Sequence, residues 1–529
     1  MEFDVALKPL DLAVIALYVV ALLSLGFWIS FRRGHTKDIF LAGRSLGWAN
    51  AGLSMWGTNI TPTSMIAVSG AAYSTGLLTS NFALLAWPFL MLLGMVFVPH
   101  YLNTRISTMP EFMSRRYDES CRMFLSFYTI LATVVVWLGA TLYTGGVLVD
   151  QLFDRCSFVG GVLALCAIAT SFTIAGGLTA VVITDSFQCI LMVGASFALA
   201  AIGFTKIGGF SNLVEAVPPH FWDLFQSGKG CQYPWYALLL GYPILGIWFW
   251  STDQTIVQRV LGARDIRQGQ LAALFVAYMK IVDPVIFWIP GILCFALHRN
   301  LASPDRAYVT MVTTYLPTGM VGLIVAVLIA AVISTVDSGL NSLSTVFTLD
   351  IYRKLFRPSA SEHEIRRVGR IVTVGAAVIG FAFALVLKKI EGTLFFKLQS
   401  LIGFTAPPMA AVFFIGVFWK RATAPAALST MILGTLGSIV VGVSYYSGYP
   451  GFIHWPQYEG FFLIIAFAMF VLLCLFMVVV SLITPAPAPE KALPSLRETY
   501  RDKTHRTKTT WLLWAILAAI MAAIYIIFN

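Results

Sequence analysis

Long apolar segments that recur along the whole chain constrain the fold of this sequence more than any other feature. A helix needs about 20 mostly apolar residues to cross the hydrocarbon core of a bilayer. Fourteen segments meet this requirement, at about 9–31, 47–73, 77–100, 121–150, 157–174, 179–206, 233–256, 268–298, 318–350, 367–387, 393–418, 424–446, 460–484 and 510–528. Only 11% of the residues are charged, whereas roughly 25% are charged in soluble proteins. The sequence therefore predicts an all-α integral membrane protein and excludes a soluble enzyme, a disordered chain and a fibrous repeat.

The distribution of basic residues predicts the orientation of the spans. With the N-terminus outside, 25 of the 35 lysine and arginine residues fall in cytoplasmic segments, 8 fall outside and 2 lie within or at the end of spans. Lysine and arginine favour the cytoplasmic side of membrane proteins. The net charge of +10 is thus explained by topology and not by binding to nucleic acid. The predicted outside loops contain no N-glycosylation sequon, which favours a bacterial inner membrane over an animal plasma membrane.

The segments between the spans are short and leave no globular domain. The longest polar stretch, 485–509, is rich in proline and then charged, and it is predicted to be a cytoplasmic linker before the last span. Cys156 and Cys231 both fall in segments predicted to lie outside, where they could form a disulfide. No cysteine or histidine spacing typical of a metal site occurs in the sequence.

Ten polar or charged residues lie inside the predicted spans. They are Asn59, Asp185, Gln188, Asp253, Gln254, Lys280, Asp283, Asp337, Asn341 and Gln399. Such residues are costly in a bilayer, and each needs a partner or a function. A hydrogen bond between helices would explain any one of them. Ten residues spread over six spans instead favour a polar site near the middle of the membrane.

The second span contains a predicted helix break. Residues 54–76 read SMWGTNITPTSMIAVSGAAYSTG, and Pro62 interrupts the apolar helix because it lacks a backbone donor. A break there frees carbonyl oxygens at about residues 57–60, and irregular backbone at membrane depth is tolerated only where it lines a cavity or binds something. Carbonyl oxygens beside hydroxyls suit a small cation such as Na⁺. A simple proline kink is the alternative.

The ninth span adds further oxygen ligands. Its sequence AAVISTVDSGLNS places two hydroxyls side by side, at Ser334 and Thr335, and two polar residues one helical turn apart, at Asp337 and Asn341. Hydroxyls on this helix that faced the carbonyls of the broken span would complete a five-oxygen cation site. Spacing along the sequence does not show whether the two spans meet.

The seventh span joins aromatic and polar residues. Trp248, Phe249 and Trp250 are followed directly by a polar run, residues 251–254. Aromatic faces beside polar groups suit a sugar-like or ring-bearing solute, because such ligands present apolar faces and hydroxyl edges. An aromatic belt at the membrane interface is the alternative.

Six ordered motifs resemble the sodium:solute symporter family, and in particular the sodium/glucose cotransporters. The resemblance extends from about residue 40 to residue 420. The motifs are FLAGRSLGW (40–48), TMPEF around Glu111, AGGLTAVVITDSFQ (175–188), WFWSTDQTIVQR (248–259), LNSLSTVFTLDIY (340–352) and LQSLIGFTAPPMAAVFFIGVFWKR (398–421).

The resemblance implies the inverted-repeat fold of the bacterial leucine transporter, in which two five-helix repeats are related by an axis in the membrane plane. The first helix of each repeat is broken in that fold, which here implies breaks at Pro62 and near Phe249. The implied parts are an N-terminal extra helix with a cytoplasmic loop (1–46), a ten-helix transport core (47–422) with repeats at about 47–206 and 233–418, and C-terminal extra helices (423–529) that include the linker at 485–509.

The resemblance also implies a sodium site. Its ligands would be the backbone carbonyls of Gly57, Ile60 and Ala331 and the hydroxyls of Ser334 and Thr335. Asp185 corresponds to an acidic residue linked to sodium passage in the family. A charge near the inner interface that pairs with a basic loop is the alternative for Asp185.

The solute site of the family is only partly present. Three positions match sugar-contacting residues: Asn59, Lys280 and Gln399. Four positions differ: Ala83 replaces a glutamate, Trp137 an asparagine, Ser64 a glutamine or histidine, and Phe249 a stacking tyrosine of the inner gate. The lost hydrogen-bonding groups favour a smaller or differently shaped solute than a hexose. The predicted solute-binding residues are Asn59, Ser64, Trp137, Phe249, Trp250, Asp253, Lys280 and Gln399.

We therefore expect a symporter that imports a small organic solute, of the sugar or polyol kind, with Na⁺ by alternating access. A symporter for a monocarboxylate or another non-sugar solute is the first alternative, although Lys280 is the only basic residue found for such a pocket. A solute sensor or channel and a proton-coupled transporter are further alternatives. No set of nucleophile and base supports an enzyme. The expected partners are the solute, Na⁺ and the lipid bilayer.

Overall fold

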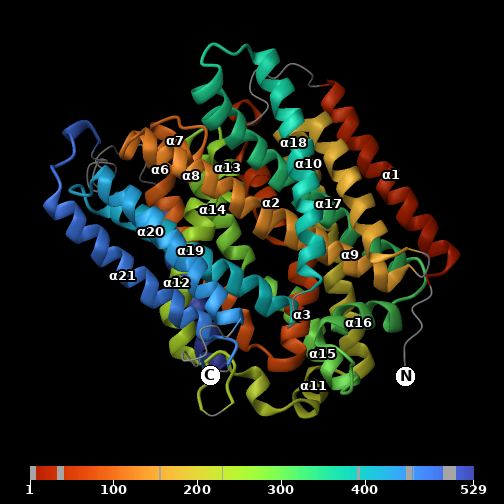
Figure 1. The fold of residues 1–529 in the computed structure, drawn as a ribbon. Coiled ribbons are helices and arrows are strands. Elements are labelled where there is room, and N and C mark those ends of the chain that lie inside the picture. The colour runs from red at the N-terminus through yellow and green to blue at the C-terminus, as the bar shows by residue number, and fades with distance from the viewer. Residues whose placement is uncertain are drawn as a thin grey trace.

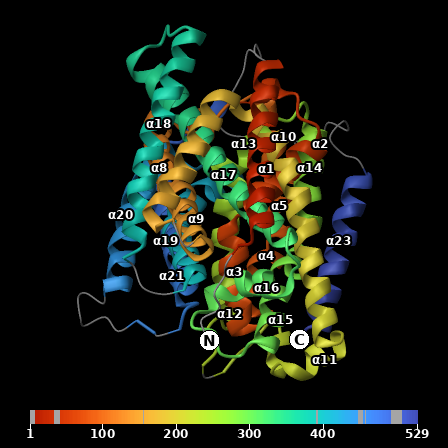
Figure 2. The ribbon, with the colours of Figure 1, turned by 90° about the vertical axis from the view of Figure 1, so that its right-hand side faces the viewer.

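The computed structural model describes residues 7–32, 41–153, 156–228, 230–389, 393–447, 455–456, 458–491 and 508–529, of which residues 23, 25–32, 62–63 and 175–186 are described by their backbone alone. This part of the chain is almost entirely helical and contains no β-strand. Most of the long helices run in the same general direction across the molecule (Figures 1 and 2). The predicted all-α membrane architecture is confirmed.

Among the described residues, nine helical stretches are long and apolar enough to cross a bilayer, and a tenth candidate is a bent pair. The nine are Leu78–Asn103, Glu119–Leu152, Phe187–Ile207, Met320–Phe356, Glu362–Leu387, Leu394–Phe418, Ala424–Ser447, Phe461–Ile483 and Lys508–Ile527. All nine overlap predicted spans. Helix α1 (Pro9–Arg32) lies where the first span was predicted. The total of fourteen spans stays a prediction.

The predicted loop between the fifth and sixth spans is absent from the structure. Helix α10 is continuous over Phe158–Ile207, so the segments expected at 157–174 and 179–206 are joined. Gly176 and Gly177 lie between the two predicted spans. A glycine costs a helix about 1 kcal/mol, but unlike proline it keeps the backbone donor, and the apolar flanks let the helix continue.

The second span is broken where proline predicts it. Helix α2 (Trp48–Asn59) ends at Asn59, and helix α3 (Pro62–Thr75) begins at Pro62. Ile60 and Thr61, which lie between them, have non-helical backbone, and the Thr61 hydroxyl caps α3 by accepting from the Ser64 amide at 2.9 Å. The break therefore has a proline at the start of its second half and a side-chain cap to hold it open.

The seventh span is also interrupted, but four residues later than predicted. Helix α12 (Trp235–Gly246) continues into the π-helix η6 (Ile247–Thr252), which contains Phe249, and the backbone becomes extended at Asp253. Helix α13 (Gln254–Leu261) follows. A π-helical turn leaves backbone groups without their usual partners and is common at functional sites. The second break thus lies at Asp253 rather than at Phe249.

A third interruption is one that the sequence did not predict. Helix α14 (Ile266–Met279) and the π-helix η7 (Pro284–Trp288), which continues as α15 (Ile289–Leu297), are bent by 41° across residues 280–283. Pro284 interrupts the helical hydrogen bonds here, because it lacks the amide that would donate to Lys280 O and its ring crowds that carbonyl, although Asp283 itself keeps helical backbone angles. The bend places Lys280 and Asp283 at its two ends.

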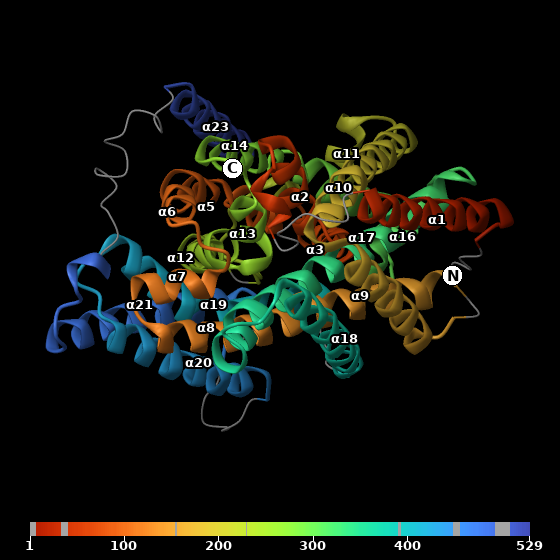
Figure 3. The ribbon, with the colours of Figure 1, turned by 90° about the horizontal axis from the view of Figure 1, so that it is seen from above.

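Helix α17 (Met320–Val346) is the most enclosed span. It is 89% buried over its apolar window, whereas α21 (Phe461–Ile483) and α23 (Lys508–Ile527) are 22% buried. From above, α17 lies inside the bundle, and α1, α21 and α23 lie at its edge (Figure 3). Helix α17 contacts both α2 and α3. It therefore reaches the break in the second span, as a shared cation site requires.

The N-terminal helix is attached to the start of α17. The buried carboxylate of Asp11 in α1 accepts from the backbone amides of Gly319 and Gly322, at 2.7 and 2.9 Å. It satisfies two amides at a helix N-terminus, where a negative charge is also favoured by the helix dipole.

Cys156 and Cys231 are both free thiols in the structure, so the disulfide considered for them is not formed.

Candidate functional site

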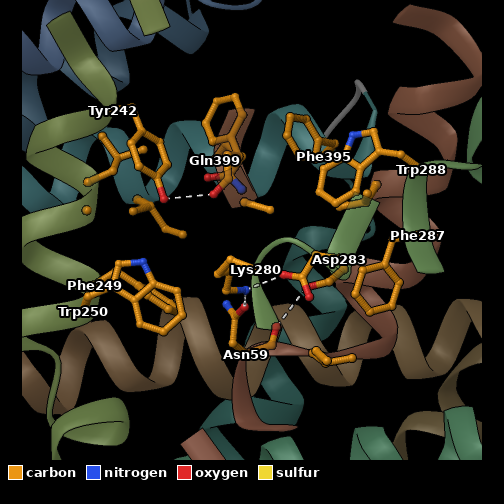
Figure 4. A pocket seen from close by; sticks show the side chains of 18 residues that line it. Asn59, Tyr242, Phe249, Trp250, Lys280, Asp283, Phe287, Trp288, Phe395 and Gln399 are labelled. Atoms are coloured by element: carbon orange, nitrogen blue, oxygen red, sulfur yellow. Dashed lines mark hydrogen bonds and ion pairs between the residues drawn. The ribbon is translucent and has the colours of Figure 1, made fainter. Parts of the chain in front are cut away.

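Six of the eight predicted solute-binding residues line one cavity of about 110 Å³. They are Asn59, Ser64, Phe249, Trp250, Lys280 and Gln399. The residues come from both sides of the first break, from the π-helix η6, from the bend after α14 and from α19 (Leu394–Phe418). Figure 4 shows the aromatic rings and the charged network around this space. The structure therefore brings these six residues together around one cavity.

A buried ion pair lies at one wall of the cavity. Lys280 Nζ lies 2.5 Å from Asp283 Oδ2, and it also donates to Asn59 Oδ1 (Figure 4). The second oxygen of Asp283 accepts from Trp56 Nε1 at 2.9 Å. Both charged side chains are almost completely buried. The network thus joins the end of α2 to the bend after α14, and it neutralises the lysine within the protein.

Aromatic side chains form a second part of the site. The rings of Phe249 and Trp250 meet edge to face with centroids 5.0 Å apart, and Lys280 Nζ lies 5.2 Å from the centroid of Trp250. Phe249 is also stacked on Trp137, with centroids 5.6 Å apart and an interplanar angle of 24°. An apolar ring face beside a fixed polar network is the arrangement expected around a solute with an apolar face and polar edges.

Trp137 and Asp253, which were predicted to bind solute, are not among the residues that line the cavity. Trp137 reaches it only through Phe249. Its Nε1 donates to Asp253 Oδ2 at 3.3 Å. Asp253 Oδ1 accepts from the amides of Thr255 and Ile256, at 2.9 and 3.2 Å. Asp253 is therefore the N-cap of α13, because its extended backbone at the break leaves those amides without helical partners.

The cavity also contains residues that were not among the predicted solute-binding residues. They include Asp283, Tyr242, Phe82, Phe287, Trp288 and Phe395. The i, i+3 spacing of Lys280 and Asp283 was a usable signal, because residues three apart on a helical turn meet. The apolar aromatic residues had no such signal, since aromatic residues occur throughout the spans. Ala83, where the family has a glutamate, does line the cavity.

The first break frees two carbonyl oxygens. In a continuous helix, the amide of Thr61 would donate to Gly57 and the amide of Ser64 to Ile60. Here the Thr61 amide donates to Asn59 O at 3.1 Å, and the Ser64 amide donates to the Thr61 hydroxyl. The carbonyls of Gly57 and Ile60 are thereby released from helical hydrogen bonds. These are the two carbonyls of the broken helix that were predicted to bind Na⁺.

The other predicted sodium ligands lie on the enclosed helix α17. Ala331, Ser334 and Thr335 are all buried there, and Thr335 Oγ1 has no hydrogen-bond partner in the structure. A buried hydroxyl without a partner is costly and marks a position where a ligand or ion can act as one. The chemistry of hydroxyls and carbonyls fits a hard cation. The side chain of Asp185, predicted to assist sodium passage, lies outside the described residues.

Comparison with known proteins identifies the family. The model of the sodium:solute symporter family matches residues 39–434. The chain belongs to the sodium:solute symporter family. It is 33% identical to a sodium/mannose cotransporter from Bos taurus, with 91% of this chain and 88% of that protein covered. It is 31% identical to a sodium/glucose cotransporter from Vibrio parahaemolyticus, with 82% of this chain and 84% of that protein covered.

The fold has a counterpart among solved structures. A Na⁺-coupled sialic acid symporter, solved in a substrate-bound outward-open state, superimposes with a TM-score of 0.75 at 23% identity, covering 91% of this chain and 99% of that chain. This likeness extends the fold assignment over nearly the whole chain. Membership of the family makes the protein a sodium-coupled membrane transporter and not an enzyme, with Na⁺ as the coupling ion.

Proposed function

We propose that this symporter imports a small, neutral, polyhydroxylated solute, of the sugar or polyol kind, together with Na⁺ by alternating access. Relatives at 30% identity or more are named as cotransporters for sodium with mannose, glucose or myo-inositol. The observation that carries the proposal for this chain is the buried Lys280–Asp283 pair in the wall of the cavity.

The ion pair favours a neutral solute over a carboxylate. A carboxylate needs a basic side chain to offset the cost of leaving water. Among the described residues that line the cavity, Lys280 is the one that is basic, and it is already paired with Asp283 and bonded to Asn59. A hydroxyl, in contrast, can donate to Asp283 or accept from Lys280 without upsetting the charge balance. The pocket therefore supports hydroxyl recognition.

The lining also favours a compact solute. The cavity carries Ala83 and Phe249 where the sugar-contacting residues of the family have a glutamate and a tyrosine. Fewer fixed hydrogen-bonding groups remain, among them those of Asn59, Ser64, Gln399 and the ion pair. A site loses discrimination for each hydroxyl that it does not bind. We therefore propose that a small cyclic polyol is a better substrate than a hexose.

Sodium couples to this site through the first break. Gly57, Ile60, Ala331, Ser334 and Thr335 are the proposed sodium ligands, and Asp185 the proposed residue of sodium passage. Ile60 lies in both the proposed ligand set and the cavity wall, and Asn59 joins the break to Lys280. Na⁺ that binds more tightly to the outward-open state shifts the population toward it and forms the solute pocket.

The proposed topology follows the charge distribution. We place the N-terminus outside, the basic loops in the cytoplasm and the protein in the plasma membrane. Because the predicted outside loops contain no sequon, we propose that this is the inner membrane of a bacterium. The proposed parts are the extra helix before residue 47, the transport core at 47–422 and the extra helices at 423–529. The low burial of α21 and α23 supports their position outside the core.

The decisive experiment is uptake into proteoliposomes with and without an inward Na⁺ gradient. A panel of labelled myo-inositol, glucose, mannose and a monocarboxylate should show Na⁺-driven accumulation of a polyol or sugar and none of the carboxylate. Accumulation of the carboxylate would overturn the argument from the ion pair. Solute flux without accumulation against a gradient would indicate a channel and overturn symport.

A further inference from the structure

A second cavity lies apart from the transport site and faces the membrane. It is a groove of about 530 Å³ between α8 (Glu119–Ala132), α19 and α20 (Ala424–Ser447), closed at one end by the last residue of α18 (Glu362–Leu387). Figure 2 shows these four helices together on one side of the molecule. The groove shares no lining residue with the transport cavity.

The groove is apolar and open along its length. Its two edges are formed by Leu131 and Val443, which are 56% and 61% exposed, and its floor includes Ala132 and Phe404, which are buried. Where α8 meets α19, the Tyr128 hydroxyl is satisfied within the protein, because it donates to Thr405 O at 2.6 Å. Two further hydroxyls that line the groove on α20, those of Thr435 and Ser438, have no hydrogen-bond partner in the structure. In a membrane-spanning region, such a surface is in contact with hydrocarbon.

The length of the groove equals about one leaflet. Along α20 it is lined from Thr435 to Ser447, a stretch of twelve helical steps. At about 1.5 Å per residue this is about 18 Å, and half of the hydrocarbon core is about 15 Å. Gly442 lies within this stretch, and a Cβ added there would approach the Phe404 ring to 3.4 Å. The missing side chain at Gly442 therefore gives the groove its depth.

Basic and polar groups gather at one end of the groove. Ser447 ends α20, Leu387 ends α18, and Lys397 lies in the first turn of α19, so all three mark the same side of the membrane. Lys388 and Lys389 follow Leu387 directly and are exposed, and Lys388 Nζ lies 4.5 Å from the centroid of the Phe158 ring. Lys397 is buried, with its Nζ 6.0 Å from the centroid of Tyr143. Lysine near a membrane surface attracts the phosphate of a lipid headgroup. The other end of the groove, near Thr435, lies at mid-membrane depth.

We propose that this groove is a binding site for one acyl chain of a glycerophospholipid, with the phosphate held at the lysine end. An apolar channel of leaflet length with cationic groups at its outer end matches the two parts of such a lipid. An ordered chain there would fill the space between α20, which belongs to the extra helices, and the core helices α8 and α19.

The test is photocrosslinking in vesicles of phosphatidylethanolamine and phosphatidylglycerol. One phosphatidylglycerol probe carries a diazirine near the end of an acyl chain, and a second carries it next to the ester. Mass spectrometry of the digested protein should locate the first label near residues 435–439 and the second near residues 443–447. Equal labelling of all lipid-exposed faces of α20 by both probes would overturn the site and indicate ordinary boundary lipid.

Matched variants on α20 distinguish a specific lipid-binding site from general exposure of the helix to lipid. Gly442→Leu fills the groove, and Gly437→Leu adds the same side chain where no atom lies within 4 Å of an added Cβ. Labelling within the groove should fall several-fold in Gly442→Leu and stay unchanged in Gly437→Leu. Val443→Trp narrows the groove from its edge, and it replaces Gly442→Leu in the test if that variant is not monodisperse in detergent. Unchanged labelling in a well-folded groove variant would contradict the proposal.

Discussion

The two broken spans differ in how their exposed backbone is satisfied. At the second break, Asp253 caps the helix that it begins and accepts from two amides of its own segment. At the first break, the Thr61 hydroxyl caps one side, but the released carbonyls of Gly57 and Ile60 have no helical partner. The first break is held instead by side chains from another span, through the bonds of Lys280 to Asn59 and of Asp283 to Trp56.

This difference indicates that the two breaks have different functions. The carbonyls of the first break have lost their helical hydrogen bonds, and the buried Thr335 hydroxyl, which has no hydrogen-bond partner, lies on a helix that contacts both halves of this break. The polar network of Lys280, Asp283 and Asn59 forms a wall of the cavity. The second break satisfies itself and carries the stacked rings of Trp137 and Phe249. We infer that the first break binds ligands, whereas the second positions the aromatic wall. Four substitutions test this comparison, from the largest expected effect to the smallest.

Asp283→Asn should have the largest effect, because it removes the anion from the buried pair at the bend after α14 that holds the first break through Asn59 and Trp56. Loss of one partner of a buried ion pair costs about 3–5 kcal/mol. The variant should lose thermal stability in detergent and should lose solute affinity, measured by binding or uptake. The double variant Lys280→Met/Asp283→Leu, which removes both charges, should recover stability but not solute binding. Solute affinity that survives in Asp283→Asn would show that the network is not part of the site.

Thr335→Ala should weaken sodium dependence. Removing a hydroxyl that binds a charged group costs about 1.5–3 kcal/mol, which corresponds to about a 10- to 100-fold rise in the Na⁺ concentration for half-maximal uptake. Thr335→Ser keeps the hydroxyl and should restore the value. The control is Thr373→Val on α18, where the hydroxyl of a buried threonine donates to Gly369 O at 2.9 Å. If both variants shift Na⁺ dependence equally, the assignment of Thr335 fails.

The sequence predicted the first break better than the rest of the site, and the reason is local. Pro62 lacks a donor, so the position of that break depends on one residue and its neighbours. The bond between Lys280 and Asn59 joins residues 221 apart in sequence, and no spacing rule reveals such a contact. The helix α10 shows the opposite error, since the segments 157–174 and 179–206 were predicted as two spans and form one continuous helix. The sequence also contained a usable signal for the second break. Asp253 is a residue type that favours the N-cap position, and it directly precedes the helix that begins at Gln254.

Asp253→Ala should reduce stability moderately and leave sodium dependence unchanged. Loss of an N-cap costs about 1 kcal/mol, with a range of roughly 0.5–2 kcal/mol. The reason for the limited effect is that Asp253 satisfies its own helix and does not line the solute cavity. Thermal unfolding in detergent measures the cost, and Asp253→Ser, which can still cap, should recover most of it. A change in half-saturation by Na⁺ comparable to that of Thr335→Ala would erase the distinction between the two breaks.

Trp137→Phe should have the smallest effect. It removes the indole N–H that donates to Asp253 over 3.3 Å, which is near the upper limit for such a bond, and it keeps a ring that can stack on Phe249. We expect a loss of less than about 1 kcal/mol in stability and nearly unchanged solute affinity, measured by uptake at varied solute concentration. Trp137→Ala removes the stacked ring as well and should lower solute affinity, because Phe249 then loses the surface that fixes its orientation. Equal effects of the two variants would show that the hydrogen bond, and not the ring contact, positions the aromatic wall.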